Sequence, residues 1–558
     1  MPFVCFFLLL ACFLMGGYGV LCLFGLRLQS VYTVTLSLLL GVALASFLPF
    51  LLQLCFVPIT GVSVFGSLAL VSLLLNIPTA NRIRKQGAAR SMRGSGPGAW
   101  RIRMYEIPYL LILGFLIFVS VWRCYYYPVT SRDALSGPEA IAEFAVREHT
   151  LINSFFDIDL WSTNNPFKSP FLISLQVVYK LAGFPFGQVW LSIVFISLTV
   201  FLYRALCEKL HPLLAGTLLL LFTIAPEPYA YTFMILYDYS NMVYFFLGLF
   251  FLFRWFSAGA SPDGAARGQA QDPSQIQRTL TPTVATAGAA AGQAADPSPV
   301  QPARSFYFAG LLLGIATYIR SETLILVFLF LPPILLRQWR SRSPLAKILA
   351  RDLLFILPSL LGYLLPVQLY VNHYLPVHYD VGGLIDPNAA LPGLFRRYAD
   401  IFTRLLTGRL SIELWGYFFY LTAILLAAES ILIRRFNSEA RNWLYAILAL
   451  YVGLGLIGWL FPVMDLTDST KRALFKMLPL ALLYLANNQF LLQLSAAIAR
   501  WEQKGPLRRL VPLSSRSTAT ASRKVLTKTG KTTIAQTRSR SRGASVSARP
   551  PGSRRKKK

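Results

Sequence analysis

The amino-acid sequence predicts an all-α protein that crosses a membrane many times. Hydrophobic residues make up 55% of its 558 residues and charged residues only 14%, whereas a soluble domain carries about 25% charged residues. Apolar runs close to the length of about 20 residues that crosses a bilayer as a helix recur along most of the chain. These features exclude a soluble globular enzyme and a protein with a single membrane anchor.

Thirteen apolar segments, which predict about 13 transmembrane helices, follow one another along the chain. They are residues 3–26, 31–54, 57–77, 107–122, 186–206, 212–226, 233–253, 306–319, 323–337, 353–372, 411–433, 442–461 and 473–495. The pair at 306–319 and 323–337 is short, which predicts either two tilted helices or one broken, re-entrant element. Gly310 and Gly314 in the first of the pair predict close packing against another helix.

Composition divides the chain into an N-terminal extension of three membrane helices, a membrane core and a basic tail. These parts are residues 1–78, 107–495 and 496–558, and a basic loop at 79–106 joins the first two. Three long loops interrupt the core: outer loops at 123–170 and 373–410, and an inner loop at 255–305. The inner loop and the tail contain few large apolar residues, so both are expected to be disordered and cytoplasmic.

Four clusters of Lys and Arg set the predicted orientation. They lie in the loop 79–106, in the segment 337–351, around Arg434 and in the tail. Thirteen crossings place all four on one side, which the positive-inside rule makes cytoplasmic. The N-terminus is then outside and the C-terminus is cytoplasmic. Since the sequence has no retention signal, we expect the cell inner membrane of a bacterium.

The tail carries more than half of the formal net charge of +29. From Arg500 to Lys558 it contains 18 Lys and Arg and a single acidic residue, Glu502. We expect it to contact the anionic lipids of the cytoplasmic leaflet. A basic tail can also bind nucleic acid, but no nucleic acid is expected as the partner of a protein with so many membrane segments.

The first outer loop holds the acidic residues that are candidates for catalysis. Asp133 follows a membrane segment directly, where a carboxylate can act as a general base toward an acceptor hydroxyl or bind a divalent metal ion. The alternative is an ordinary turn residue. After it, Pro138 and Glu139 start a predicted amphipathic helix that can lie on the membrane surface, with Glu143 and Glu148 on its solvated face.

Charged residues at the borders of the apolar segments are candidates for binding an anion. Lys168 is expected near the bilayer surface, where it can meet a phosphate or act as a snorkelling anchor. Arg320 and Glu322 lie between two apolar stretches, which indicates either a mutual ion pair or a phosphate site at Arg320. Other charges at these borders are Glu227, Asp238, Arg472 and Lys476. In the second outer loop, Arg396 and Arg397 lie on the side that the positive-inside rule disfavours, which indicates anion binding.

Three motifs, in this order, make residues 107–495 resemble the GT-C superfamily of membrane glycosyltransferases, of the protein O-mannosyltransferase and aminoarabinose transferase type (glycosyltransferase family 39). The first is an outer loop that begins at Asp133 and ends at Lys168-Ser169-Pro170-Phe171, before Leu181-Ala182-Gly183-Phe184. The second is Ala309-Gly310-Leu311, followed by Gly314-Ile315-Ala316 and Arg320. The third is Arg472 ahead of Pro479.

The chain departs from the pattern of this family at two positions. The family often has two adjacent acids at the start of the loop, whereas this chain has Arg132-Asp133-Ala134. The second acid could then be Glu139, Asp157 or Asp159, or be absent. Ala473 follows the last arginine, where the family usually has an aromatic residue. The first departure leaves the use of a divalent cation (Mg²⁺ or Mn²⁺) open.

The resemblance implies transfer of a sugar from a polyprenyl-phosphate-linked donor to a lipid, glycan or protein acceptor on the outer, periplasmic face. Asp133 would deprotonate the acceptor, and Arg320, Arg472 and Lys168 would hold the phosphate. Such enzymes invert the anomeric centre in a single displacement. Two alternatives are a transporter or flippase of lipid-linked saccharides and a noncatalytic membrane scaffold. A transporter would require charged residues deep in several helices and inverted repeats, and no internal repeat is visible in the sequence.

Overall fold

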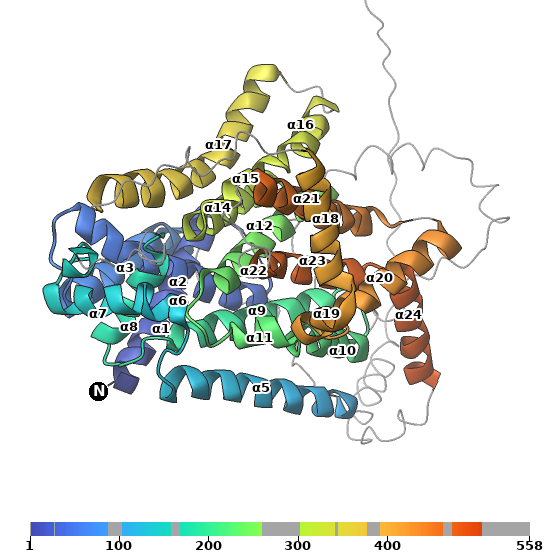
Figure 1. The fold of residues 1–558 in the computed structure, drawn as a ribbon, viewed down its shortest axis with the longest axis horizontal. Coiled ribbons are helices and arrows are strands. Elements are labelled where there is room, and N and C mark those ends of the chain that lie inside the picture. Colours follow the sequence, from blue (N-terminus) through green and yellow to red (C-terminus); the bar gives the residue numbers. More distant parts are fainter. Residues whose placement is uncertain are drawn as a thin grey trace, which may run out of the picture. The chain divides into compact units, whose positions relative to one another are not determined.

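A computed structural model of the chain describes nine stretches of residues. They are 2–26, 28–86, 103–157, 168–258, 302–340, 344–375, 391–434, 436–460 and 471–504. Every regular element in these stretches is a helix and none is a strand, which confirms the predicted all-α class (Figure 1). Most of the predicted loop 255–305, most of the tail 496–558 and part of each outer loop lie outside the described residues.

The N-terminal extension consists of α1 (Pro2–Phe24), α2 (Ser30–Leu54) and α3 (Gly61–Gln86). It packs directly on the core, since Tyr244 in α12 (Tyr237–Ala258) donates a hydrogen bond to the Leu39 carbonyl of α2. Backbones approach closely within the extension: a Cβ added at Gly17 of α1 would lie 1.9 Å from the Ser37 carbonyl oxygen of α2. The extension and the core therefore form one packed body.

The core continues through helices whose bounds follow the predicted apolar segments. The first half contains η1 (Met104–Glu106), α5 (Ile107–Tyr126), α6 (Arg132–Leu135), α7 (Pro138–Glu148), η2 (Ser154–Asp157), α8 (Phe171–Leu181), α9 (Val189–Cys207), α10 (Pro212–Thr223), α11 (Pro226–Ala230) and α12. The second half contains α14 (Pro302–Ile319), α15 (Thr323–Phe328), α16 (Leu331–Arg340), α17 (Leu345–Tyr363), η3 (Leu364–Tyr374), α18 (Leu391–Leu406), α19 (Gly408–Trp415), α20 (Phe418–Ala428), η5 (Glu429–Ile433), α21 (Ser438–Leu460), α22 (Lys471–Ala473), η7 (Leu474–Lys476), α23 (Met477–Ala486) and α24 (Gln489–Lys504).

Eight described helices are long and apolar enough to cross a membrane, and two bent pairs raise the count to ten. The protein is therefore a multi-pass integral membrane protein, but the predicted count of about 13 is not confirmed. All thirteen predicted segments are helical; α10, α14 and the α15–α16 segment are the shorter ones. The pair α19 and α20–η5 bends by 104°, and η7–α23 and α24 bend by 54°. Since the orientation argument used thirteen crossings, the sidedness stays a prediction.

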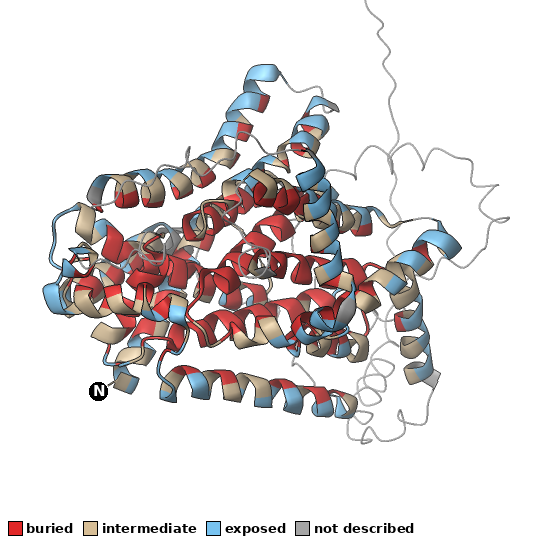
Figure 2. Ribbon diagram, viewed as in Figure 1, coloured by how far each residue is buried: buried red, intermediate tan, exposed pale blue. Residues whose placement is uncertain are grey.

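Burial separates the inner helices from those with a lipid-facing side. Figure 2 shows buried residues along α9 and α12 and exposed ones along α5. Leu111, Phe115 and Phe118 of α5 are exposed, which suits a helix that borders lipid. The predicted close approach at α14 is confirmed, since a Cβ at Gly310 would lie 2.6 Å from the Phe355 carbonyl oxygen of α17. Helix α24 reaches Lys504 and so extends into the segment predicted to be disordered.

Candidate functional site

A cluster of charged side chains forms where the ends of several helices meet. Its members come from α6, from the residues before α8, from the start of α12, from the break between α14 and α15, and from α22–η7. They are Asp133, Lys168, Asp238, Arg320, Glu322, Arg472 and Lys476. We call these seven residues the charged cluster. Four of them, Asp133, Lys168, Arg320 and Arg472, are the residues that the sequence predicted for catalysis and phosphate binding.

Arg320 forms the centre of the charged cluster. Its Nη1 makes an ion pair with Asp238 Oδ1, and its Nε makes a second with Glu322 Oε1. The Asp238 side chain is only 3% exposed. Of the two predicted alternatives for Arg320, the ion pair with Glu322 is present, and Asp238 is a partner that the sequence did not indicate.

The helix break that carries Arg320 is stabilised by hydrogen bonds from α12. Helix α14 ends at Ile319 and α15 begins at Thr323. Asn241 Nδ2 donates to the Ala316 carbonyl (2.6 Å) and to Thr323 Oγ1 (3.0 Å). The Ala316 carbonyl also accepts the backbone hydrogen bond from the Arg320 N–H (3.0 Å). Asn241 therefore links the last turn of α14 and the first residue of α15 to α12, and so stabilises the interruption. The structure has helices separated by a break here, a feature that both predicted forms of this segment share.

Asp133 and Arg472 meet although 339 residues separate them in the sequence. Arg472 Nη1 donates to Asp133 Oδ2 over 2.6 Å, and both side chains keep partial exposure, at 20% and 29% respectively. The Nε of Arg472 is buried and has no hydrogen-bond partner among the described residues. The hydrogen bond from Arg472 therefore holds the Asp133 carboxylate in place. The Arg472 guanidinium keeps one donor, its Nε, that no described residue accepts.

Lys168 belongs to the same cluster, and its Nζ lies 5.7 Å from the centroid of the Tyr237 ring. The Tyr237 hydroxyl donates to the Ser169 carbonyl over 2.9 Å, which fixes the turn before α8. Burial lowers the pKa of Lys168 from its ordinary 10.5 to about 8; nearby Arg320 adds to this effect, and Asp238 and Asp133 oppose it. Lys168 is therefore a cation at neutral pH, close to the other members of the cluster.

Lys476 completes the charged cluster, and its assignment to a site was missed at the sequence level. Its residue is 1% exposed, and its charge interacts with Glu322, Arg320 and Asp238. The signal was present in the sequence, because Lys476 is a charged residue at the start of an apolar segment, where such residues are costly. The charged cluster thus contains four cations and three carboxylates. An excess of buried positive charge favours an anionic ligand.

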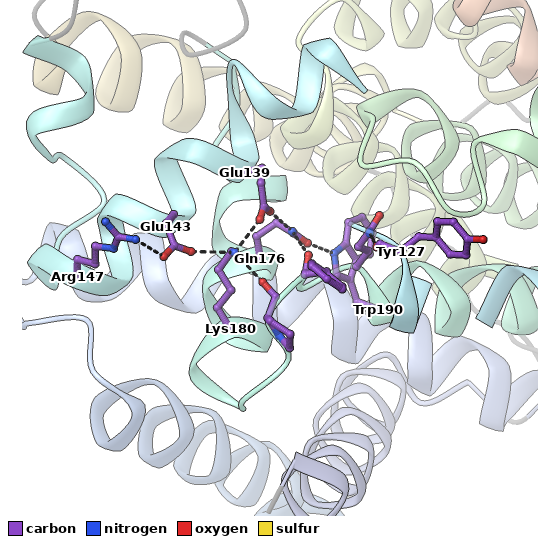
Figure 3. A network of polar contacts seen from close by, with 10 residues as sticks. Tyr127, Glu139, Glu143, Arg147, Gln176, Lys180 and Trp190 are labelled. Carbon is purple, nitrogen blue, oxygen red and sulfur yellow. Dashed lines mark hydrogen bonds and ion pairs between the residues drawn. The ribbon is translucent and has the colours of Figure 1, made fainter. Parts of the chain in front are cut away.

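Glu139 and Glu143 have a different role, shown in Figure 3. Lys180 in α8 forms ion pairs with Glu139 (2.7 Å) and Glu143 (3.1 Å) and donates to the Pro185 carbonyl (2.9 Å). Gln176 Nε2 also donates to Glu139, over 2.6 Å. The predicted amphipathic helix is α7, but it packs on α8 through Ile141 and its neighbours. Glu139, a candidate second acid, therefore anchors α7.

The other candidates lie apart from these contacts. Asp157 is exposed at the end of η2, and Asp159 lies outside the described residues. Arg396 is exposed on α18. Arg397 donates from Nε (3.0 Å) and Nη2 (2.6 Å) to the Gly458 carbonyl near the C-terminus of α21, where a cation complements the helix dipole.

Metal-binding groups of His, Cys, Asp and Glu do not assemble in the described part of the chain. No three of these side chains come together there in an arrangement that could hold an ion. Asp133, which was a candidate ligand, faces Arg472. Comparison with known proteins adds no identification, since no protein-family model, no curated protein and no solved structure matches the chain.

The Lys180 contacts lead to a first prediction. Lys180→Met would leave Glu139 partly buried without its cation, and breaking such a pair costs about 3–5 kcal/mol. Helix α7 should therefore detach from α8, which hydrogen exchange of residues 138–148 would detect as lost protection. The control is Arg147→Gln, because Arg147 pairs with Glu143 at 70% exposure and an exposed pair contributes about 0–1 kcal/mol. Equal protection in the two variants would contradict the anchoring role.

Proposed function

We propose that the protein is an integral membrane glycosyltransferase. It transfers a sugar from a polyprenyl-phosphate-linked donor to an acceptor on the outer face of the membrane. One observation carries this proposal: Asp133, Lys168, Arg320 and Arg472, which lie far apart in the sequence, belong to one partly buried cluster in which cations outnumber carboxylates. The acceptor class, whether lipid, glycan or protein, remains open in the proposal.

The phosphate of such a donor needs positive charge at the membrane border. Charge develops on the leaving phosphate as its bond to the sugar breaks, and fixed cations in a site of low polarity stabilise that charge. Lys168 and Arg472 would supply it, whereas Arg320, which the sequence suggested for the same role, is already paired with two carboxylates. Helices α8, α12 and α23 begin beside the cluster, and the N-terminus of a helix favours an anion.

Asp133 would act as the general base. The acceptor oxygen attacks the anomeric carbon, its proton passes to the Asp133 carboxylate, and the bond between the anomeric carbon and the phosphate oxygen breaks. Polyprenyl phosphate leaves, and the anomeric centre is inverted. Arg472, bound to Asp133 over 2.6 Å, orients the carboxylate.

The position of the charged cluster at helix ends favours an enzyme over a transporter. Asp133 follows α5, Asp238 lies at the start of α12 and Arg320 follows α14. Secondary transporters bind their substrates near the middle of the bilayer, between repeated units. A site at helix ends is accessible to a lipid-linked phosphate and an external acceptor. We further propose a bacterial inner membrane location with the C-terminus in the cytoplasm.

The direct test uses the purified full-length protein in liposomes. It is given a panel of polyprenyl-phosphate sugars, and release of free polyprenyl phosphate is measured. Release with at least one donor, together with a glycosylated acceptor, supports the proposal. No release with any donor, together with movement of a labelled lipid-linked saccharide between leaflets, would replace it by the transporter. If neither occurs, the scaffold alternative is favoured.

The lowered pKa of Lys168 predicts how donor binding depends on pH. Lys168 is protonated below its pKa of about 8 and neutral above it. The affinity for polyprenyl phosphate should therefore fall as the pH rises through about 8. Lys168→Arg should reduce this step, because arginine keeps its charge. An unchanged step in this variant would assign the titration to another group.

A further inference from the structure

Two cations lie one helical turn apart immediately before α23. Arg472 belongs to α22 and Lys476 to η7, and the helical segments from Lys471 to Ala486 follow one another without a gap. Both side chains also interact electrostatically with the same carboxylate, Asp238. The two cations therefore point into the same region of the charged cluster.

Each of these two cations has a hydrogen-bond donor or a positive charge that its neighbours do not fully satisfy. The Nε of Arg472 is a buried donor without a partner in the described part of the protein. Lys476 is 1% exposed, and the carboxylates nearest to its charge, Glu322 and Asp238, are already paired with Arg320. A buried charge without a full partner is costly, and an unsatisfied buried donor requires an explanation such as a bound ligand.

Arg320 has no positive charge left for an anion. Asp238 and Glu322 together carry two negative charges beside its single positive charge. A phosphate placed next to this group would meet two carboxylates as well as the guanidinium. The charge available to an anion therefore lies on the α22–η7 turn, and Arg320 acts as a positioning residue that holds α12 and the α14–α15 break together.

We propose that Arg472 and Lys476 form the binding pair for the phosphate group of a polyprenyl phosphate. Arg472 keeps Asp133 in place through Nη1 and donates to the phosphate through Nε. Lys476, at the end of η7, neutralises the charge of the phosphate. The N-terminus of α23, which starts at Met477, adds its dipole to the same place. The choice of a lipid-linked phosphate rests on the proposed function, whereas the anion site rests on the two side chains.

The test compares the full-length wild type with Lys476→Met and Lys476→Arg in nanodiscs of zwitterionic lipid. The probes are farnesyl phosphate and, in a separate arm, inorganic phosphate. Without ligand, Lys476→Met should melt at a higher temperature than the wild type, because a buried unpaired charge is replaced by an apolar side chain of similar length. Its affinity for farnesyl phosphate should fall about tenfold or more, whereas Lys476→Arg should keep most of the affinity.

A matched control is Lys209→Met, since Lys209 is 39% exposed and pairs with Glu439 away from the cluster. Its affinity for farnesyl phosphate should not change. The proposal is overturned if Lys476→Met melts at a lower temperature and binds farnesyl phosphate as the wild type does. Equal binding of inorganic phosphate and farnesyl phosphate would overturn the lipid-linked identity of the ligand.

Failure of this inference and failure of the proposed function give different results. If wild type transfers no sugar but Lys476→Met loses farnesyl phosphate binding, the anion site stands and the glycosyltransferase does not. If Lys476→Met transfers sugar with an unchanged KM for the donor, the glycosyltransferase stands and the role of Lys476 is wrong.

Discussion

Replacing Asp133 with Asn is expected to lower the rate of sugar transfer by about 100- to 10,000-fold, which is the usual contribution of a general base. Asn keeps the shape of the side chain and an oxygen that can accept the hydrogen bond from Arg472 Nη1, now 2.6 Å from the carboxylate. It cannot take a proton from the acceptor. The affinity for polyprenyl phosphate should therefore change little while kcat falls, which single-turnover transfer and donor titration measure separately.

The control for this prediction is Asp157→Asn in the same outer loop. Asp157 is exposed at the end of η2, and it was a candidate for the second acid. If Asp133 is the base, Asp157→Asn should transfer sugar at the wild-type rate. Comparable losses in both variants would point to a paired-acid site. A loss in Asp157→Asn alone would refute the assignment of Asp133.

Arg320→Met should give the largest loss of stability among the substitutions in the charged cluster. It leaves Asp238 and Glu322 without their cation, and breaking a buried ion pair in this way costs about 3–5 kcal/mol. The side chains of Arg320, Asp238 and Glu322 are only 16%, 3% and 15% exposed, so water compensates little. Unfolding in mixed micelles should show the loss as a transition at lower denaturant concentration.

Neutralising the two carboxylates should rescue the stability. In the triple variant Arg320→Met, Asp238→Asn and Glu322→Gln, no uncompensated charge remains at the break, and most of the lost stability should return. Arg396→Met is the matched control, because Arg396 is exposed on α18 and its replacement should cost less than about 0.5 kcal/mol. A triple variant as unstable as Arg320→Met would show that the loss comes from packing and not from charge.

The apolar segments were predictable, but the number of spans was not. Hydropathy reports whether a window is apolar, and each predicted segment is helical. It does not report where a helix breaks or turns within the window. The segment 411–433 turns by 104° at Gly416, whose φ of +59° glycine adopts without strain. The break at Arg320 is bridged by Asn241, which lies 75 residues from Ala316, whose carbonyl it binds.

The candidate site was predictable as a set of residues but not as a set of contacts. Charges at the borders of apolar segments are costly and therefore noticeable, and the resemblance to a family of membrane glycosyltransferases selected Asp133, Lys168, Arg320 and Arg472 among them. Their partners are set by contacts across long stretches of sequence: Arg320 with Asp238 across 82 residues, and Arg472 with Asp133 across 339. Glu139 has the same residue type as a catalytic acid, and only its contact with Lys180 shows that it anchors a helix.

The sequence by itself determined that this protein is an all-helical, multi-pass membrane protein with polar residues at the ends of its helices. Both properties follow from composition and local periodicity, since a backbone in lipid must satisfy its own hydrogen bonds. The tertiary structure alone decided which charges neutralise each other and which remain available. Charge balance depends on distances between side chains, and the packing of α6, α12, α14 and α22 sets those distances. The role of Lys476 therefore became visible only in the folded protein.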